Sequence, residues 1–225
     1  MNIFTFWEGP MPAYILLCML TWKQPFTVLT YDNLNEYTDL PIDKIKRFTL
    51  PQISDIVRVH VLRDQGGRWL DADTIMLAED WPDADFVGYP EKRGISCAFL
   101  RTEPHTDLFE KWAEHQDRII HSSETPTYWA TFANQFPEPY LAEHPGIEIK
   151  PIDAYWPETY MINESIQRYD KYRKFYFERN FHLSDIRKTD LLMLHNSWTP
   201  DWYKNLITGD VLKYDCTLSN ILREI

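Results

Sequence analysis

The sequence predicts an α/β domain, and three observations point to it. Residues 2–6 form an aromatic and β-branched segment of the kind that favours a strand. An apolar helical segment follows at 12–23, and a second strand-like segment, F-T-V-L-T, at 26–30. This order is typical of two parallel strands joined by a crossover helix. Because no internal repeat, low-complexity tract or long linker interrupts the pattern, we expect a single domain of residues 1–225.

Glycine and proline punctuate the first half of the chain. The turn after the first strand contains Gly9 and Pro10, and Pro12 suits the first turn of the helix that follows. Gly66 and Gly67 allow the positive φ that ends a helix. The remaining elements expected in this half are a helix at 54–65, a strand at 68–70 and an apolar run at 75–77.

Apolar spacing indicates the elements of the second half. Leu108, Trp112 and Ile119 recur at helical spacing, which predicts an amphipathic helix at 106–120. The other predicted elements are strands at 86–89, 96–100, 147–152 and 190–194, a helix at 126–136 and a short closing helix at 216–225.

Composition and charge exclude several classes of protein. A formal net charge of −11 repels polyanions, so nucleic acid is not an expected partner. The nine Trp and thirteen Tyr exceed what a core usually needs, and such rings often line clefts that bind sugars, although core packing accounts for most of them. Cys18, Cys97 and Cys216 are widely spaced and form no metal-ligand pattern, which predicts buried, reduced thiols in a cytoplasmic protein.

The N-terminal apolar stretch has the features of a folded segment. Glu8, Pro10 and Pro12 interrupt it and no basic region precedes it, so we do not expect a signal peptide. The apolar residues 13–22 fall short of the roughly twenty that a membrane span needs, and a buried helix is expected there.

Asp71, Ala72 and Asp73 follow directly after the strand predicted at 68–70. Two carboxylates separated by one small residue offer hard oxygen donors, which suit Mg²⁺ or Mn²⁺ better than zinc. Such a pair can hold a divalent ion against a diphosphate, so that the ion neutralises the charge developing on a leaving group. Acidic turns are common, so the neighbouring motifs decide whether this turn is a site.

Four further residues are candidates for the same site. Asp55 and Arg58 lie three apart and share a helix face, where they either grip sugar hydroxyls and a phosphate or form a surface ion pair worth well under about 1 kcal/mol. Trp7 follows the first strand and either lies flat on a nucleobase or belongs to the core. His195 follows a late strand and is either a metal ligand or an ordinary strand-end residue.

Taken in order, four motifs resemble one enzyme family. They are F-W-E-G at 6–9, S-D-I-V-R at 54–58, L-R-D-Q-G-G-R-W-L-D-A-D-T at 62–74 and H-N-S-W at 195–198. This set is similar to the D-x-D glycosyltransferases of family 32, which include capsular-polysaccharide and yeast Och1-like sugar transferases and are distantly similar to the glucosyltransferase domain of large clostridial toxins. The match covers mainly the first hundred residues and the motif near 195, and it lapses between about 120 and 190.

The resemblance implies a GT-A fold, which is a Rossmann-like mixed sheet flanked by helices. It also implies transfer of a sugar, with retention of anomeric configuration, from a nucleotide-diphosphate sugar to a glycan or lipid-linked hydroxyl. It implies a donor-binding part at about 1–105 and an acceptor-side and closing part at about 106–225. It further implies Mn²⁺ or Mg²⁺ as cofactor and a UDP- or GDP-sugar as donor. By position, the resemblance implies that Trp7 would stack on the base, and that Asp55 and Arg58 would contact the donor sugar and phosphate. Asp71 would reach ribose and metal, and Asp73 would ligate the metal directly. Ser197 and Trp198 would close over the diphosphate with His195 beside it, and residues 94–100 would border the donor sugar.

Two other functions remain open at this stage. Residues 71–74 also read D-x-D-x-T, the motif of haloacid-dehalogenase-like phosphatases, with an acidic segment at 209–215 as the second motif. In that family the nucleophilic aspartate ends a longer apolar strand, whereas only Trp69 and Leu70 precede Asp71 here. A non-catalytic sugar-binding module would explain the aromatic content but not the paired carboxylates.

Residues 168–188 are the one basic and aromatic segment of an acidic chain. Seven Lys and Arg against three acidic residues give this segment a net charge of +4 and leave −15 for the remainder. One interpretation is peripheral contact with the anionic inner face of a membrane, or with a lipid-diphosphate acceptor. The alternative is a helix that packs Tyr169, Tyr172 and Tyr176 inward and holds its basic side chains in solvent.

Overall fold

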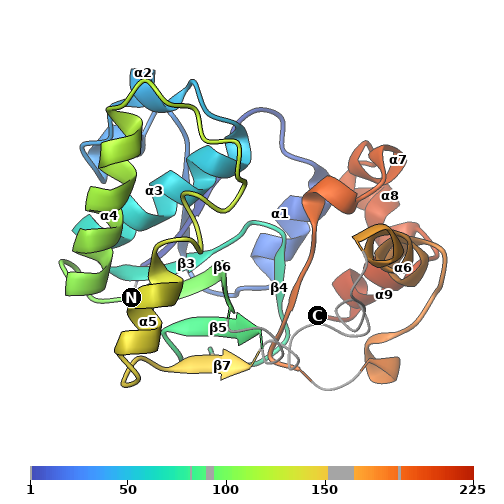
Figure 1. The fold of residues 1–225 in the computed structure, drawn as a ribbon. Helices are drawn as coiled ribbons and strands as arrows, with labels where there is room; N and C mark the ends of the chain where they lie inside the picture. The colour runs from blue at the N-terminus through green and yellow to red at the C-terminus, as the bar shows by residue number, and fades with distance from the viewer. Residues whose placement is uncertain (1, 82, 90–93, 152–164, 187–188) are drawn as a thin grey trace. The chain divides into compact units, whose positions relative to one another are not determined.

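The computed structural model describes residues 2–81, 83–89, 94–151, 165–186 and 189–225 (Figure 1). The chain forms two compact units. The first, called the sheet unit below, comprises residues 1–9, 24–71 and 83–151; the second, the helical unit, comprises 10–23, 72–82 and 152–225. The chain passes from the first unit to the second between Asp71 and Ala72, inside the D-x-D sequence.

The sheet unit is built on a six-stranded mixed sheet with the order β2-β1-β3-β6-β5-β7. β1 pairs in parallel with β2 and with β3, β6 is antiparallel to β3 and β5, and β7 is parallel to β5. The α/β class with a mixed sheet and flanking helices is therefore confirmed, as is the parallel pair of opening strands. The strands are β1 Ile3–Phe6, β2 Phe26–Leu29, β3 Gly67–Leu70, β5 Phe86–Tyr89, β6 Gly94–Thr102 and β7 Ile149–Pro151.

Two long helices, α3 (Leu50–Gln65) and α4 (Asp107–Ile120), lie together on one side of this sheet (Figure 1). α3 begins four residues earlier than predicted because Thr49 and Gln52 form a capping box, in which the Thr49 N–H donates to Gln52 Oε1 at 3.1 Å. Apolar side chains of both helices pack with those of the central strands into one hydrophobic core, and Trp69 and Trp112 are fully buried there.

The predicted glycine turn after α3 is confirmed. Gly66 and Gly67 have φ of +61° and +100°, a region that side chains with a Cβ rarely adopt. A Cβ on Gly67 would lie 2.6 Å from the Asn2 carbonyl oxygen, and a Cβ on Gly66 would lie 2.6 Å from Pro104 Cδ. The two glycines therefore let β3 start directly after α3 and run beside β1.

The prediction of a helix at 126–136 is wrong. These residues form a loop of turns, and the helix α5 begins only at Pro137 and runs to Glu143. The Phe132 carbonyl, which a helix would pair internally, instead accepts hydrogen bonds from Trp112 Nε1 at 3.0 Å and Gln116 Nε2 at 2.6 Å. Side chains of α4 thus satisfy the loop backbone, while proline is favourable in the first turn of the helix that follows.

The polar segment 34–51 contains short elements that the sequence did not predict. They are a 3₁₀ turn, Leu34–Glu36, and the short helix α2, Ile42–Ile45. Leu34 and Ile45 are fully buried, so single apolar residues anchor this otherwise polar connection to the core.

The helical unit gathers helices around the two-stranded antiparallel ladder of β4 and β8. Trp22 Nε1 donates to the Thr74 carbonyl at 2.9 Å, and Thr21 Oγ1 accepts from the Met76 N–H at 2.8 Å, which ties the end of α1 to β4. No helix of the described residues is long and apolar enough to cross a membrane. The elements are α1 Ala13–Leu20, β4 Thr74–Met76, α6 Ser165–Phe177, η3 Leu183–Asp185, β8 Leu191–Met193, η4 Asn196–Trp198, α7 Asp201–Lys204, α8 Thr208–Lys213 and α9 Thr217–Glu224.

Candidate functional site

In the sheet unit, Asp55, Arg58 and Asp71 come together as one charged cluster, called the Arg58 cluster below. The sequence of α3 places Asp55 and Arg58 on the same face, and β3 delivers Asp71 at its carboxyl end. Arg58 Nη2 lies 2.9 Å from Asp55 Oδ1 and 3.2 Å from Asp71 Oδ1. One guanidinium therefore bridges the two carboxylates, so these three candidate residues lie together.

Arg58 is a buried side chain with only 5% of its surface exposed, so the alternative of a surface ion pair is wrong. Its Nε donates to the Ser54 carbonyl at 3.3 Å, and its Nη1 donates to the carbonyl of Cys97 on β6. The guanidinium also lies over the Trp69 ring, 5.3 Å from the centroid. A buried arginine that uses its whole fork holds the neighbouring carboxylates in fixed positions.

Asp71 is held at the same point by backbone and side-chain contacts. Its N–H donates to the Ala98 carbonyl at 3.0 Å, and its Oδ1 accepts from Trp69 Nε1 at 2.9 Å. Its side chain is partly exposed, whereas that of Asp55 is mostly buried. Burial raises the pKa of Asp55 to about 7, with the Arg58 charge opposing this rise and the Asp71 charge adding to it. Burial therefore disfavours the charged form of Asp55, and the Arg58 guanidinium only partly compensates.

Trp7 lies where the sequence placed it, directly after β1. Its N–H donates to the Leu29 carbonyl at 3.0 Å, and its side chain is half-buried. The indole Nε1 is buried and has no hydrogen-bond partner within the described part of the chain. Beside it, the Glu8 carboxylate accepts the Tyr31 N–H, and the Tyr31 ring packs edge-on against Phe6. An unsatisfied indole donor near aromatic rings is chemically suited to a planar polar ligand.

In the helical unit, Asp73 is held by the segment that follows β8. The Asn196 N–H donates to Asp73 Oδ2 at 2.7 Å, and the Leu194 N–H donates to the Asp73 carbonyl at 3.1 Å. Tyr14 Oη in turn donates to Asn196 Oδ1 at 2.6 Å. Burial and the Asp73 charge both raise the pKa of Tyr14, so its hydroxyl stays protonated as a donor. Asp73 is thus fixed from two directions.

The H-N-S-W motif forms η4 and is supported by α6. The rings of His195 and Trp198 lie 3.9 Å apart between centroids, and the His195 N–H donates to Tyr172 Oη at 3.1 Å. Arg173 Nε donates to the Trp198 carbonyl at 3.1 Å. Ser197 is exposed. Within the helical unit, the motif therefore brings the backbone of Asn196 to Asp73 and presents Ser197 to solvent.

Sequence reasoning missed two residues of this arrangement. Asn196 was part of the quoted motif, but nothing in its position alone shows that it would bind Asp73. Tyr14 lies in an apolar helix with no distinguishing pattern, and only the tertiary fold connects it with Asn196. Among the residues that the structure describes, no group of three or more His, Cys, Asp or Glu side chains converges as a complete metal site. The metal roles of Asp71, Asp73 and His195 stay predictions.

Comparison with known proteins identifies one family. A family model described as "Capsular polysaccharide synthesis protein" matches residues 2–144. A solved structure described as "PaToxG Glycosyltransferase" is 17% identical in sequence, and the match covers 64% of this chain and 69% of that chain with a TM-score of 0.43. No curated protein matches the chain.

Proposed function

Because the chain belongs to the capsular polysaccharide synthesis protein family, we propose that it is a metal-dependent, retaining glycosyltransferase with a GT-A fold. Its donor would be a nucleotide-diphosphate sugar, carrying uridine or guanosine, and its acceptor a hydroxyl of a glycan or lipid-linked glycan. The three cysteines are buried free thiols, which agrees with a reducing, cytoplasmic location.

The Arg58 cluster is the observation that supports this proposal most strongly. A buried guanidinium between two carboxylates costs desolvation energy, and replacing such a cluster with apolar residues often stabilises a protein. A ligand that uses both charges would account for its presence. Arg58 would contact a donor phosphate, and Asp55 would accept hydrogen bonds from the donor sugar hydroxyls.

The chemistry of the donor set fits a hard divalent cation. Asp71 and Asp73 lie two positions apart in the chain and offer carboxylate oxygens. Asp73 would be the direct ligand, and His195, from the C-terminal part of the chain, would be a further ligand. Mg²⁺ and Mn²⁺ sites commonly use one or two carboxylates and take their remaining ligands from substrate phosphates and water, so a cluster of three protein ligands is not required. Bound there, the cation would neutralise the charge that develops on the departing diphosphate.

The reaction requires little covalent chemistry from the protein. The bond between the sugar C1 and the phosphate oxygen breaks, and the nucleoside diphosphate leaves with the electron pair. The acceptor oxygen forms a new bond to C1 on the same face, and its proton passes to the departing phosphate oxygen. The protein's contribution is to position the donor and stabilise charge: Trp7 would stack on the base, and Ser197 with Trp198 would close over the diphosphate.

The test is hydrolysis of nucleotide sugars without acceptor, screened over UDP- and GDP-sugars with Mn²⁺. We expect one donor to yield free sugar and nucleoside diphosphate, and EDTA to stop the reaction. The same preparation should not release phosphate from p-nitrophenyl phosphate. Phosphate release that depends on Asp71 would instead support the phosphatase alternative and contradict the proposal.

A further inference from the structure

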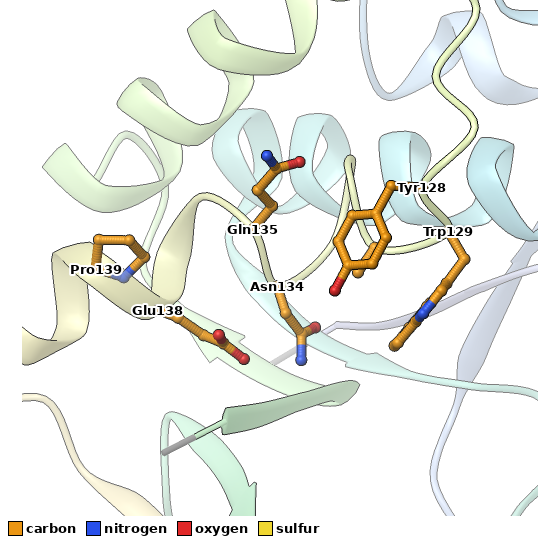
Figure 2. A pocket seen from close by; sticks show the side chains of 7 residues that line it. Tyr128, Trp129, Asn134, Gln135, Glu138 and Pro139 are labelled. Carbon is orange, nitrogen blue, oxygen red and sulfur yellow. The ribbon is translucent and has the colours of Figure 1, made fainter. Parts of the chain in front are cut away.

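A pocket of about 340 Å³ lies in the sheet unit, on the loop that precedes α5 and on the first turn of that helix (Figure 2). Its volume is within the range of small-ligand sites. None of its residues was singled out by sequence motifs. The lining residues are Tyr128, Trp129, Ala130, Asn134, Gln135, Glu138 and Pro139.

Two aromatic side chains form one wall. Trp129 and Tyr128 are 69% and 55% exposed, and their ring centroids lie 6.0 Å apart. Large apolar rings held open to solvent beside a hollow are typical of binding sites, because burial by a ligand would recover their transfer free energy. The C–H face of a pyranose is a flat apolar surface that matches such rings.

Polar groups supply the opposite side of the pocket. Asn134 and Glu138 point toward the space beside the two rings, whereas Gln135 extends away from it (Figure 2). Within the described residues, the Glu138 side chain has no hydrogen-bond partner. A carboxylate and an amide beside aromatic rings offer the acceptors and donors that sugar hydroxyls require.

The loop that carries the two rings is held in place by contacts with the hydrophobic core and with α4. Its Phe132 side chain is fully buried and packs 4.9 Å from the ring of Phe48, while the Phe132 carbonyl binds Trp112 and Gln116. Gln116 Nε2 also donates to the Asp55 carbonyl at 3.1 Å. The loop is therefore anchored to α3 at the residue that begins the Arg58 cluster.

A single residue of β6 connects the pocket with the Arg58 cluster. The Cys97 carbonyl accepts from Arg58, while its Sγ lies 3.0 Å from Asn134 Oδ1. Asn134 Nδ2 also donates to the Ile95 carbonyl. Arg58, the proposed donor-phosphate ligand, and Asn134 of the pocket thus both contact Cys97.

We infer that this pocket binds a pyranose unit of the acceptor glycan. Trp129 and Tyr128 stack on the sugar face, and Asn134 and Glu138 hydrogen-bond to its hydroxyls. This inference rests on the proposed transferase function, which needs an acceptor beside the donor. The pocket lies within the residues that the family model matches.

The first experiment measures glycan binding without any nucleotide sugar. Saturation-transfer NMR with a panel of oligosaccharides that covers the common hexoses and hexosamines should show binding to the parent protein. We expect Trp129→Ala to weaken it at least about tenfold, and Trp129→Phe to restore part of the affinity because it keeps a ring. Trp202→Ala is the matched control, since Trp202 is a partly exposed tryptophan of the helical unit. Thermal midpoints verify that each variant is folded.

The outcomes separate this inference from the proposed function. Glycan binding through Trp129 by a protein that hydrolyses no nucleotide sugar would support the pocket and contradict the transferase proposal. No binding by the parent, or equal binding by Trp129→Ala, would overturn the inference. A further arm measures donor hydrolysis without acceptor: a raised KM for the nucleotide sugar in Glu138→Gln and Trp129→Ala would put the donor sugar in the pocket and would also overturn it.

Discussion

At the scale of single residues, both aspartates of the D-x-D sequence accept a hydrogen bond from a neutral donor, and Asp71 also lies beside the Arg58 guanidinium. The Asn196 backbone N–H holds Asp73, and the Trp69 indole holds Asp71. Such neutral donors orient a carboxylate and leave its charge available to a cation. The charge on each aspartate, rather than its shape, is therefore what the proposed function requires.

Asp73→Asn tests this requirement. Asparagine keeps the shape and can still accept the Asn196 N–H, but it removes the charge that the cation needs. We expect donor hydrolysis to fall by two orders of magnitude or more, at about the parent thermal midpoint. Asp215→Asn, at an exposed position of the same unit, is the control. A fully active Asp73→Asn would remove the metal hypothesis.

Arg58→Lys tests the guanidinium fork. The sequence predicts that turnover falls far more than stability, but the structure adds a stability cost, because the fork is buried against Asp55, Asp71 and two carbonyls. We expect hydrolysis to fall at least about a hundredfold and unfolding free energy by roughly 1–3 kcal/mol. Chemical denaturation and kinetics on the folded protein measure the two effects. Arg118→Lys on the exposed face of α4 should change neither.

At the scale of elements, the sequence predicts what local signals determine. β-Branched and aromatic composition, apolar helical spacing, and glycine and proline positions placed β1, α1, β2 and the end of α3 correctly. The loop at 128–136 could not be predicted, because its backbone is satisfied by Trp112 and Gln116 of another helix. For the same reason the sequence could name Asp55 and Arg58 but not the Cys97 carbonyl that completes the cluster.

α3 also buries a histidine, which makes a prediction about pH. Burial and, next, the Arg63 charge lower the pKa of His60 to about 3, so it is neutral when folded. Because the unfolded chain takes up this proton at higher pH, the stability that neutral His60 contributes is lost as pH falls below about 6.5. Between about pH 7 and pH 5 the parent should lose roughly 2 kcal/mol more than His60→Gln. Asp55 is present in both proteins, so its contribution to the pH dependence of stability cancels in the comparison. Unfolding free energies from urea titrations that fall equally with pH in the parent and in His60→Gln would contradict the prediction. The control is His144→Gln, at an exposed position, which should match the parent.

α6 bears on the membrane prediction. Tyr172 and Tyr176 are buried, and Arg173 lies over Tyr169 and binds the Trp198 carbonyl, so these rings and this arginine belong to the packing of the helical unit. Lys171 and Lys174 are exposed. Each basic residue near an anionic leaflet contributes about 1 kcal/mol, so Lys171→Gln with Lys174→Gln should reduce sedimentation with phosphatidylserine vesicles about tenfold or more. Lys204→Gln with Lys213→Gln is the charge-matched control. If the parent does not sediment with such vesicles, the side of α6 that carries Lys171 and Lys174 is simply exposed to solvent.

At the scale of the whole molecule, the two aspartates of the D-x-D sequence belong to different compact units, and each is fixed by contacts of its own unit. The proposed cation would take its remaining ligands from the diphosphate. Under this proposal, binding of the cation and of the nucleotide would be coupled, because neither ligand alone would complete the coordination shell.

This dependence predicts synergy in thermal stability. A ligand that binds only the folded state raises the unfolding midpoint by mass action, and a chain of this size should gain roughly 5 °C at saturating concentrations. We expect Mn²⁺ with UDP or GDP to produce this shift, and Mn²⁺ or nucleotide alone to produce little. The nucleoside monophosphate is the matched control, because it keeps the base for Trp7 but lacks the second phosphate. Asp73→Asn should lose the synergy while keeping the parent midpoint without ligands. An equal shift by UDP or GDP in the presence of EDTA would show that nucleotide binding does not use the cation, and it would assign the phosphate contacts to Arg58 alone.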